Sequence, residues 1–151
     1  MTTNNLFDFI KYHKIKCLFL NTKEKKAFIS KLISLADGKK LHYLWDNFNS
    51  ESFITQIKIS CDPCEYREKL EEILPLGKYI LTIDDICFSD TKEPIVIEAD
   101  GKEIISILTE FYWELDEVYI SDYSGNWFIS INHNFELSFY RKNKHFFDVV
   151  G

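Results

Sequence analysis

The sequence has no long apolar run, and glycine and proline are scarce among its 151 residues. No stretch reaches the roughly 18 consecutive apolar residues that a membrane-spanning helix needs, so we expect no membrane association. The five glycines form neither a G-x-G-x-x-G fingerprint nor a phosphate-binding loop, so these signatures of nucleotide binding are missing. No repeat, low-complexity tract or Pro/Gly linker divides the chain, which predicts a single domain over residues 1–151.

The N-terminus also lacks the pattern of a secretory signal. Residues 1–10 contain Asn4, Asn5 and Asp8, and no basic region followed by a continuous apolar stretch. We therefore expect a cytoplasmic protein. Hydrophobic residues make up 46% of the chain and aromatic residues 16%, which is enough to build a core without disulfide bonds.

Four cysteines are then expected to be free thiols. Cys61 and Cys64 form a C-x-x-C motif that follows a strand-like run and precedes a helix, which is compatible with a redox site. The simpler interpretation is a pair of cysteines at a helix entry. Cys17 and Cys87 are isolated, and the four histidines show no ligand spacing, so the sequence predicts neither a metal nor a cofactor.

Catalytic patterns are equally scarce. The adjacent carboxylates Asp84 and Asp85, and Asp116 and Glu117, have no partner histidine and no phosphate-binding loop beside them. Helix capping or solvation accounts for them more simply than acid–base chemistry does. The sequence therefore favours a protein that is not an enzyme, and a small thiol-dependent enzyme or redox protein using Cys61 and Cys64 is the alternative.

Hydrophobic periodicity predicts four helices and seven strands. The expected helices span 6–12, 22–36 with Thr22 as the cap, a segment that has Asp62 as its cap and Pro63 in its first turn and ends at Pro75 and Gly77, and 101–114. Residues 41–48 fit either a helical turn or a strand. The expected strands span 15–20, 53–60, 78–83, 94–99, 117–121, 126–132 and 135–141. Short polar connections separate the last three strands, which is typical of antiparallel neighbours. The predicted fold is α+β: a mostly antiparallel sheet with a C-terminal three-stranded meander and helices packed on one face, the helix before the meander lying across it.

Negative charge is concentrated in one part of the chain. The net charge is -6, from 18 basic and 24 acidic residues, but residues 84–136 alone hold 13 acidic and 2 basic side chains. Phosphate binding needs lysine and arginine, so we expect no nucleic-acid partner. A basic protein would suit this acidic zone, because complementary potentials accelerate association. The alternative is a solvated surface that keeps the protein soluble.

One tryptophan in this zone has an unusual position. If residues 101–114 are helical, Trp113 lies directly opposite the core-facing Ile104, with Glu110, Asp116 and Glu117 at contact spacing. An exposed tryptophan with a carboxylate rim resembles a binding hot spot. The alternatives are that the helix ends near Tyr112 or that Trp113 packs beneath another segment. The predicted partner-binding residues are Glu110, Trp113, Glu114, Asp116, Glu117, Asp122 and Tyr123.

Two segments carry a family resemblance: FYWELDEVYIS at 111–121 and NWFISINHN at 126–134. An acidic-aromatic segment that enters a strand, followed by a Trp-bearing strand ending in an Asn-His turn, resembles small bacterial immunity proteins of polymorphic or contact-dependent toxin systems. The resemblance implies a non-enzymatic inhibitor that binds its cognate toxin in the cytoplasm. Many such toxins are basic nucleases. An acidic surface on the inhibitor would compete with their nucleic-acid substrate. A monomer and a homodimer both remain open.

Overall fold

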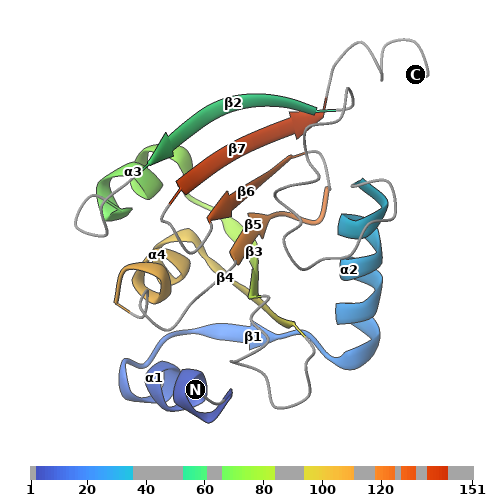
Figure 1. Cartoon of the computed structure of the whole chain (residues 1–151). Helices are drawn as coiled ribbons and strands as arrows, with labels where there is room; N and C mark the ends of the chain where they lie inside the picture. Colours follow the sequence, from blue (N-terminus) through green and yellow to red (C-terminus); the bar gives the residue numbers. More distant parts are fainter. Residues whose placement is uncertain are drawn as a thin grey trace.

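A computed structural model (Figure 1) describes residues 3–35, 53–60, 66–83, 94–110, 118–124, 127–131 and 136–142. Within these ranges the helices are α1 (Thr3–Tyr12), α2 (Thr22–Leu35), α3 (Tyr66–Ile73) and α4 (Gly101–Glu110). The strands are β1 (Cys17–Phe19), β2 (Phe53–Ser60), β3 (Lys78–Ile83), β4 (Ile95–Asp100), β5 (Val118–Ser121), β6 (Trp127–Ile131) and β7 (Glu136–Lys142).

The strands form a single sheet in the order β1-β4-β3-β5-β6-β7-β2. Every pairing between neighbours is antiparallel. Strands β5, β6 and β7 make the predicted C-terminal meander, with Ile120 opposite Ile129 and Ile129 opposite Phe139. The α+β fold class predicted from the sequence is confirmed.

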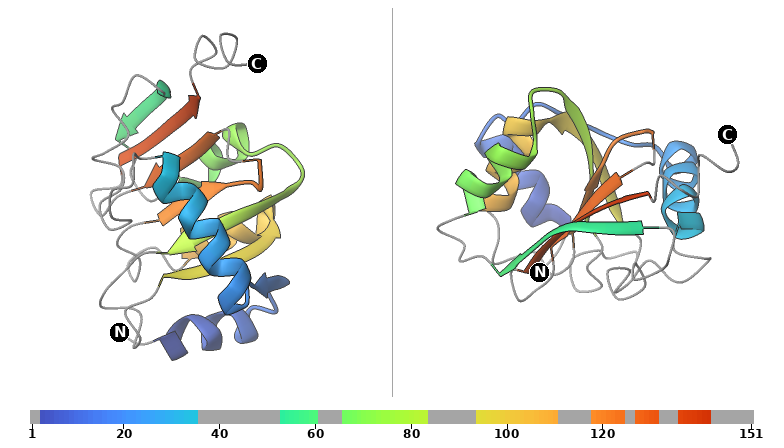
Figure 2. Two further views of the ribbon diagram at one scale, coloured as in Figure 1. Left: turned by 90° about the vertical axis from the view of Figure 1, so that its right-hand side faces the viewer. Right: turned by 90° about the horizontal axis from the view of Figure 1, so that it is seen from above.

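The helices are divided between the two faces of the sheet (Figure 2). Helices α3 and α4 pack against each other, and α4 lies on β3 and β4. We call this side the α4 face. Helix α4 was expected to lie across the meander of β5, β6 and β7, but it lies on β3 and β4 instead. Helix α2 lies on the opposite side, the α2 face, although the pattern placed all the helices on one face.

The α4 face carries the main hydrophobic core. Alternate residues of the central strands point into it, and the side chains of Leu81, Ile97, Ile120 and Ile129 are fully buried there. Helix α1 contributes Leu6, which is also fully buried in this cluster. Burying such side chains contributes about 1.5–3 kcal/mol each, so this cluster holds the helices on the sheet.

The α2 face of the sheet is buried too, but it is more polar. Ile80 and Phe128 lie among the hydroxyl groups of Thr82, Tyr119 and Ser130, all of them almost inaccessible to solvent. In the strand register Thr82 lies opposite Tyr119, and Tyr119 lies opposite Ser130. A row of hydroxyl groups therefore crosses three strands on this side of the sheet.

Local sequence explains where α2 begins. The side chain of Asn21 accepts a hydrogen bond from the backbone N–H of Glu24 at 2.8 Å, and the Glu24 carboxylate accepts one from the N–H of Asn21 at 3.2 Å. This reciprocal pair is a capping box. The cap is thus Asn21, and the prediction of Thr22 was wrong by one residue, because the Asn21 carbonyl already accepts the first helical bond, from Lys25.

Several other predicted elements match the structure. Strands 53–60 and 78–83 have the predicted bounds, while β1 is shorter than the predicted 15–20. Helix α4 is described to Glu110, and the predicted continuation to residue 114 lies outside the described residues. Within the described part of the chain, no helix has the length and hydropathy needed to cross a membrane.

Candidate functional site

The predicted partner-binding residues are only partly covered by the structure. Glu110, Asp122 and Tyr123 are described, whereas Trp113, Glu114, Asp116 and Glu117 lie outside the described residues. The predicted exposure of Trp113 therefore stays a prediction. The three described residues do not form one cluster, and each has a different environment.

Glu110 ends α4 and lies beside one histidine and one arginine. Its carboxylate lies 3.6 Å from Nδ1 of His13 and 3.9 Å from the guanidinium of Arg67. Arg67 also donates a hydrogen bond to the Thr109 hydroxyl at 3.1 Å. These contacts join α4 to α1 and α3 at half-exposed positions, where an ion pair is worth less than about 1 kcal/mol. Glu110 is engaged within the molecule.

Asp122 organises the turn that follows β5. One of its carboxylate oxygens accepts a hydrogen bond from the indole Nε1 of Trp127 at 2.9 Å. The other accepts bonds from the backbone N–H and the hydroxyl of Ser124. Burial raises the pKa of the Tyr79 phenol, and the negative charge of Asp122 raises that pKa further. Asp122 therefore stabilises the turn through these hydrogen bonds, and its carboxylate lies on the α4 side of the sheet.

Tyr123 is the described residue that best fits a binding role. Its side chain is 53% exposed, and its ring meets the buried ring of Phe28 edge-on at a centroid distance of 6.3 Å. The ammonium group of Lys31 donates a hydrogen bond to the Tyr123 carbonyl. The aromatic ring is thus fixed from below by α2 while one side remains open to solvent.

Two carboxylates act electrostatically on this ring, and the strand register places Glu98 opposite Ile80, which is itself opposite Ser121, two residues before Tyr123. Burial raises the pKa of the Tyr123 phenol, and the nearby charges of Glu98 and Glu24 raise it further. Glu98 projects from β4 and Glu24 from the first turn of α2. We call Tyr123 and the supporting Phe28, together with Glu98 and Glu24, the Tyr123 surface. Like the site predicted around Trp113, it combines an aromatic ring with carboxylates, at a different place.

The sequence-based prediction included Tyr123 but neither Glu24 nor Glu98. Both lie far from Tyr123 along the chain, and only the sheet order and the packing of α2 bring them near it. One signal was present for Glu98, because a carboxylate stands in an otherwise apolar strand, IVIEA. For Glu24 the capping box with Asn21 was the available signal.

The acidic zone is not a single face in the described structure. Five of its thirteen acidic side chains are described: Glu98, Asp100, Glu103, Glu110 and Asp122. Glu98 lies near Tyr123, whereas Glu103 raises the pKa of Cys17, whose thiol belongs to the α4 face. Helix α2, which lies on the α2 face of the sheet, carries four lysines: Lys23, Lys25, Lys26 and Lys31. The Tyr123 surface therefore combines two carboxylates with a helix that carries both Glu24 and these four lysines.

Most of the cysteines considered for thiol chemistry lie outside the described residues. Cys61 and Cys64 lie outside the described residues, so the two roles considered for them, a redox site or a helix entry, stay predictions. Cys17 is a free thiol whose pKa is raised by burial and then by Glu103, which lowers its reactivity at neutral pH. Among the residues with described positions, no three His, Cys, Asp or Glu side chains are grouped as metal ligands.

No protein-family model, curated protein or solved structure matches this chain. Its function must therefore be inferred from its own side chains and their geometry.

Proposed function

We propose that this protein is a non-enzymatic inhibitor that binds a basic partner protein through the Tyr123 surface. The observation that carries the proposal is the half-exposed ring of Tyr123, which packs on Phe28 and whose phenol is acted on by the negative charges of Glu98 and Glu24. Tyrosine is enriched among the residues that dominate binding energy, and its ring face attracts lysine and arginine. Carboxylates at the rim favour the same cationic side chains.

The rigidity of the surface supports a binding role. The turn that carries Tyr123 is held by the Asp122 hydrogen bonds to Trp127 and Ser124, and Lys31 bonds to the Tyr123 carbonyl. A side chain that is already ordered loses less conformational entropy when it binds. The Tyr123 surface is thus prepared for association before the partner arrives.

The resemblance of residues 111–121 and 126–134 to immunity proteins supports the class of partner. A cognate bacterial toxin with a basic nuclease domain would present the lysines and arginines that this surface attracts. Binding there would compete with the nucleic-acid substrate of the toxin. The protein then acts by occupying a surface, with no chemical step of its own.

The test is to express the protein together with the product of the adjacent gene and to measure the affinity of the purified pair. Tyr123→Ala is expected to weaken binding by about 2 kcal/mol, roughly thirtyfold, because it removes the aromatic anchor. Tyr12→Ala is the matched control, since Tyr12 is 83% exposed on α1, away from these carboxylates. Equal effects of the two substitutions, or none, would refute the Tyr123 surface as the binding site.

The carboxylates predict a separate kinetic effect. The double variant Glu24→Gln, Glu98→Gln should associate more slowly with the partner and show a weaker dependence of the association rate on salt, because electrostatic attraction is lost. Glutamine keeps an oxygen that can accept the Asn21 bond in the capping box. Glu72→Gln on α3 is the control, and stopped-flow association at two ionic strengths measures the difference. An unchanged salt dependence would argue against an acidic interface.

A further inference from the structure

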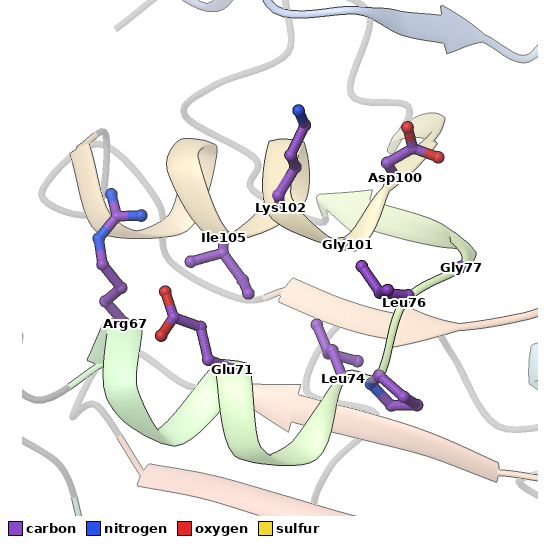
Figure 3. A pocket seen from close by; sticks show the side chains of 10 residues that line it. Arg67, Glu71, Leu74, Leu76, Gly77, Asp100, Gly101, Lys102 and Ile105 are labelled. Atoms are coloured by element: carbon purple, nitrogen blue, oxygen red, sulfur yellow. The ribbon is translucent and has the colours of Figure 1, made fainter.

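A groove of about 570 Å³ lies between α3 and the beginning of α4 (Figure 3). Leu74 and Ile105, both almost fully buried, contribute its apolar floor. Leu76 lines the same groove and is fully exposed to solvent. A leucine held wholly in water gains about 1.5–3 kcal/mol when it is covered, so this groove favours an apolar occupant.

The end of the groove at Leu76 is built rigidly. The N–H of Gly101 donates to the carbonyl of Gly77 at 3.0 Å, and the Tyr79 hydroxyl donates to the carbonyl of Pro75 at 2.6 Å. A Cβ atom on Gly101 would lie 3.3 Å from the Tyr79 ring, so glycine permits this close approach of α4 to β3. The connection that carries Leu76 is therefore fixed by hydrogen bonds, although the Leu76 side chain is exposed. The groove is already formed before any ligand enters.

The charges at the groove favour a cation over an anion. In Figure 3 the carboxylate of Glu71 points into the space between the two helices, whereas Lys102 extends from α4 away from α3. Arg67 is already paired with Glu110 and bonded to Thr109 at the far end. Asp100, the other carboxylate in the lining, lies at the opposite end beside Gly101, so the charge that points between the two helices is the carboxylate of Glu71.

We propose that this groove is a second contact site for the partner and binds an extended segment with an apolar side chain next to a lysine or arginine. The apolar side chain covers Leu76 and lies over Leu74 and Ile105, and the cation reaches Glu71. The inference rests on the proposed function for the nature of the partner. The groove lies on the α4 face and the Tyr123 surface on the α2 face. Both lie at the same end of the sheet, because Gly77 precedes β3 and Tyr123 follows β5, its antiparallel neighbour, so the partner would contact both faces around this end.

The probe is a blocked tetrapeptide, acetyl-Gly-Leu-Arg-Gly-amide, added at millimolar concentrations to the full ¹⁵N-labelled chain while amide chemical shifts are recorded. Shifts are expected at the Leu74–Gly77 connection and in the first turn of α4. Replacing the peptide leucine by serine, or its arginine by glutamate, should each raise the dissociation constant about tenfold. Equal binding of all three peptides would overturn the proposal.

Variants of the protein test the groove residues directly. Leu76→Ser and Glu71→Gln should each weaken the peptide about tenfold, and neither removes a buried group, so both should fold. Tyr123→Ala should leave peptide binding unchanged, so failure of the groove is distinguishable from failure of the Tyr123 surface. Absence of shifts in the groove would overturn the inference. A dimer that dissociates on Leu76→Ser would assign the groove to a second copy of the chain and overturn it too.

Discussion

Two hydroxyl groups on the α2 face are buried at a cost. Thr82 and Ser121 are almost fully inaccessible, and neither side-chain oxygen has a hydrogen-bond partner among the described residues. A buried polar group without a partner costs about 1–3 kcal/mol. Each hydroxyl is therefore a place where an apolar side chain of similar shape should be preferred.

Thr82→Val is expected to raise the free energy of unfolding by about 1 kcal/mol, because it removes the unsatisfied hydroxyl while keeping the side-chain shape. Urea denaturation measures the change. Thr109→Val is the matched control, since the Thr109 hydroxyl donates to the Ile105 carbonyl at 2.8 Å and accepts from Arg67. The control should destabilise the protein. Destabilisation by both variants would mean that Thr82 has a bound partner.

Cys17 should be a slow nucleophile. Burial raises its pKa and the charge of Glu103 raises it further, so less of the reactive thiolate exists at any given pH. In a chain that keeps only Cys17, with Cys61, Cys64 and Cys87 replaced by serine, a disulfide reagent at mildly alkaline pH should react more slowly with the folded than with the urea-unfolded protein. Glu103→Gln should accelerate the folded reaction, and Glu68→Gln, on α3, should not.

The same shift has a consequence for stability. The folded-state pKa of Cys17 lies above its unfolded value, so its contribution to stability is complete below the unfolded pKa and is lost as pH rises through the folded pKa. The alkaline loss of stability should therefore be smaller in Cys17→Ser. A steeper alkaline loss in the variant would contradict the assigned direction.

At the scale of elements, periodicity predicted the pieces better than their arrangement. The β-branched alternation of residues 53–60 identified β2, and the short apolar run of residues 78–83 identified β3, because both patterns are local. The pairing of β1 with β4 and of β2 with β7 joins segments distant in sequence, and no local signal encodes it. The same reason hid Glu24 and Glu98 beside Tyr123, although the tyrosine itself stands in a recognisable polar turn.

The start of α2 offers a direct test of an element boundary. Asn21→Ala should lower the free energy of unfolding by about 1 kcal/mol, because it removes the acceptor for the Glu24 N–H and breaks the capping box. Thr22→Ala, one residue later and exposed, should change it by less than about 0.5 kcal/mol. Thermal or urea unfolding distinguishes the two, and the reverse order would restore Thr22 as the cap.

At the scale of the whole molecule, the N-terminal half supplies both edges of the sheet. Strand β1 pairs with β4 at one edge and β2 pairs with β7 at the other. In the interior, β3 lies between β4 and β5, β5 between β3 and β6, and β6 between β5 and β7. Contacts between distant segments close large loops, which makes such sheets slow to fold and leaves edges to form last.

This topology predicts an order of stability within the native state. Amides of β3 and β5, each held between two strands around the fully buried Leu81 and Ile120, should exchange with solvent only through global unfolding. Amides of β1 should exchange by local opening, because this strand has three residues, one neighbour and a half-exposed Leu18. Hydrogen exchange followed by NMR at rising urea concentrations tests this, since only globally protected amides depend steeply on urea. Equal protection and urea dependence in β1 and β5 would show instead that the edge closes cooperatively with the centre, and that the molecule has no weak side at its N-terminal strand.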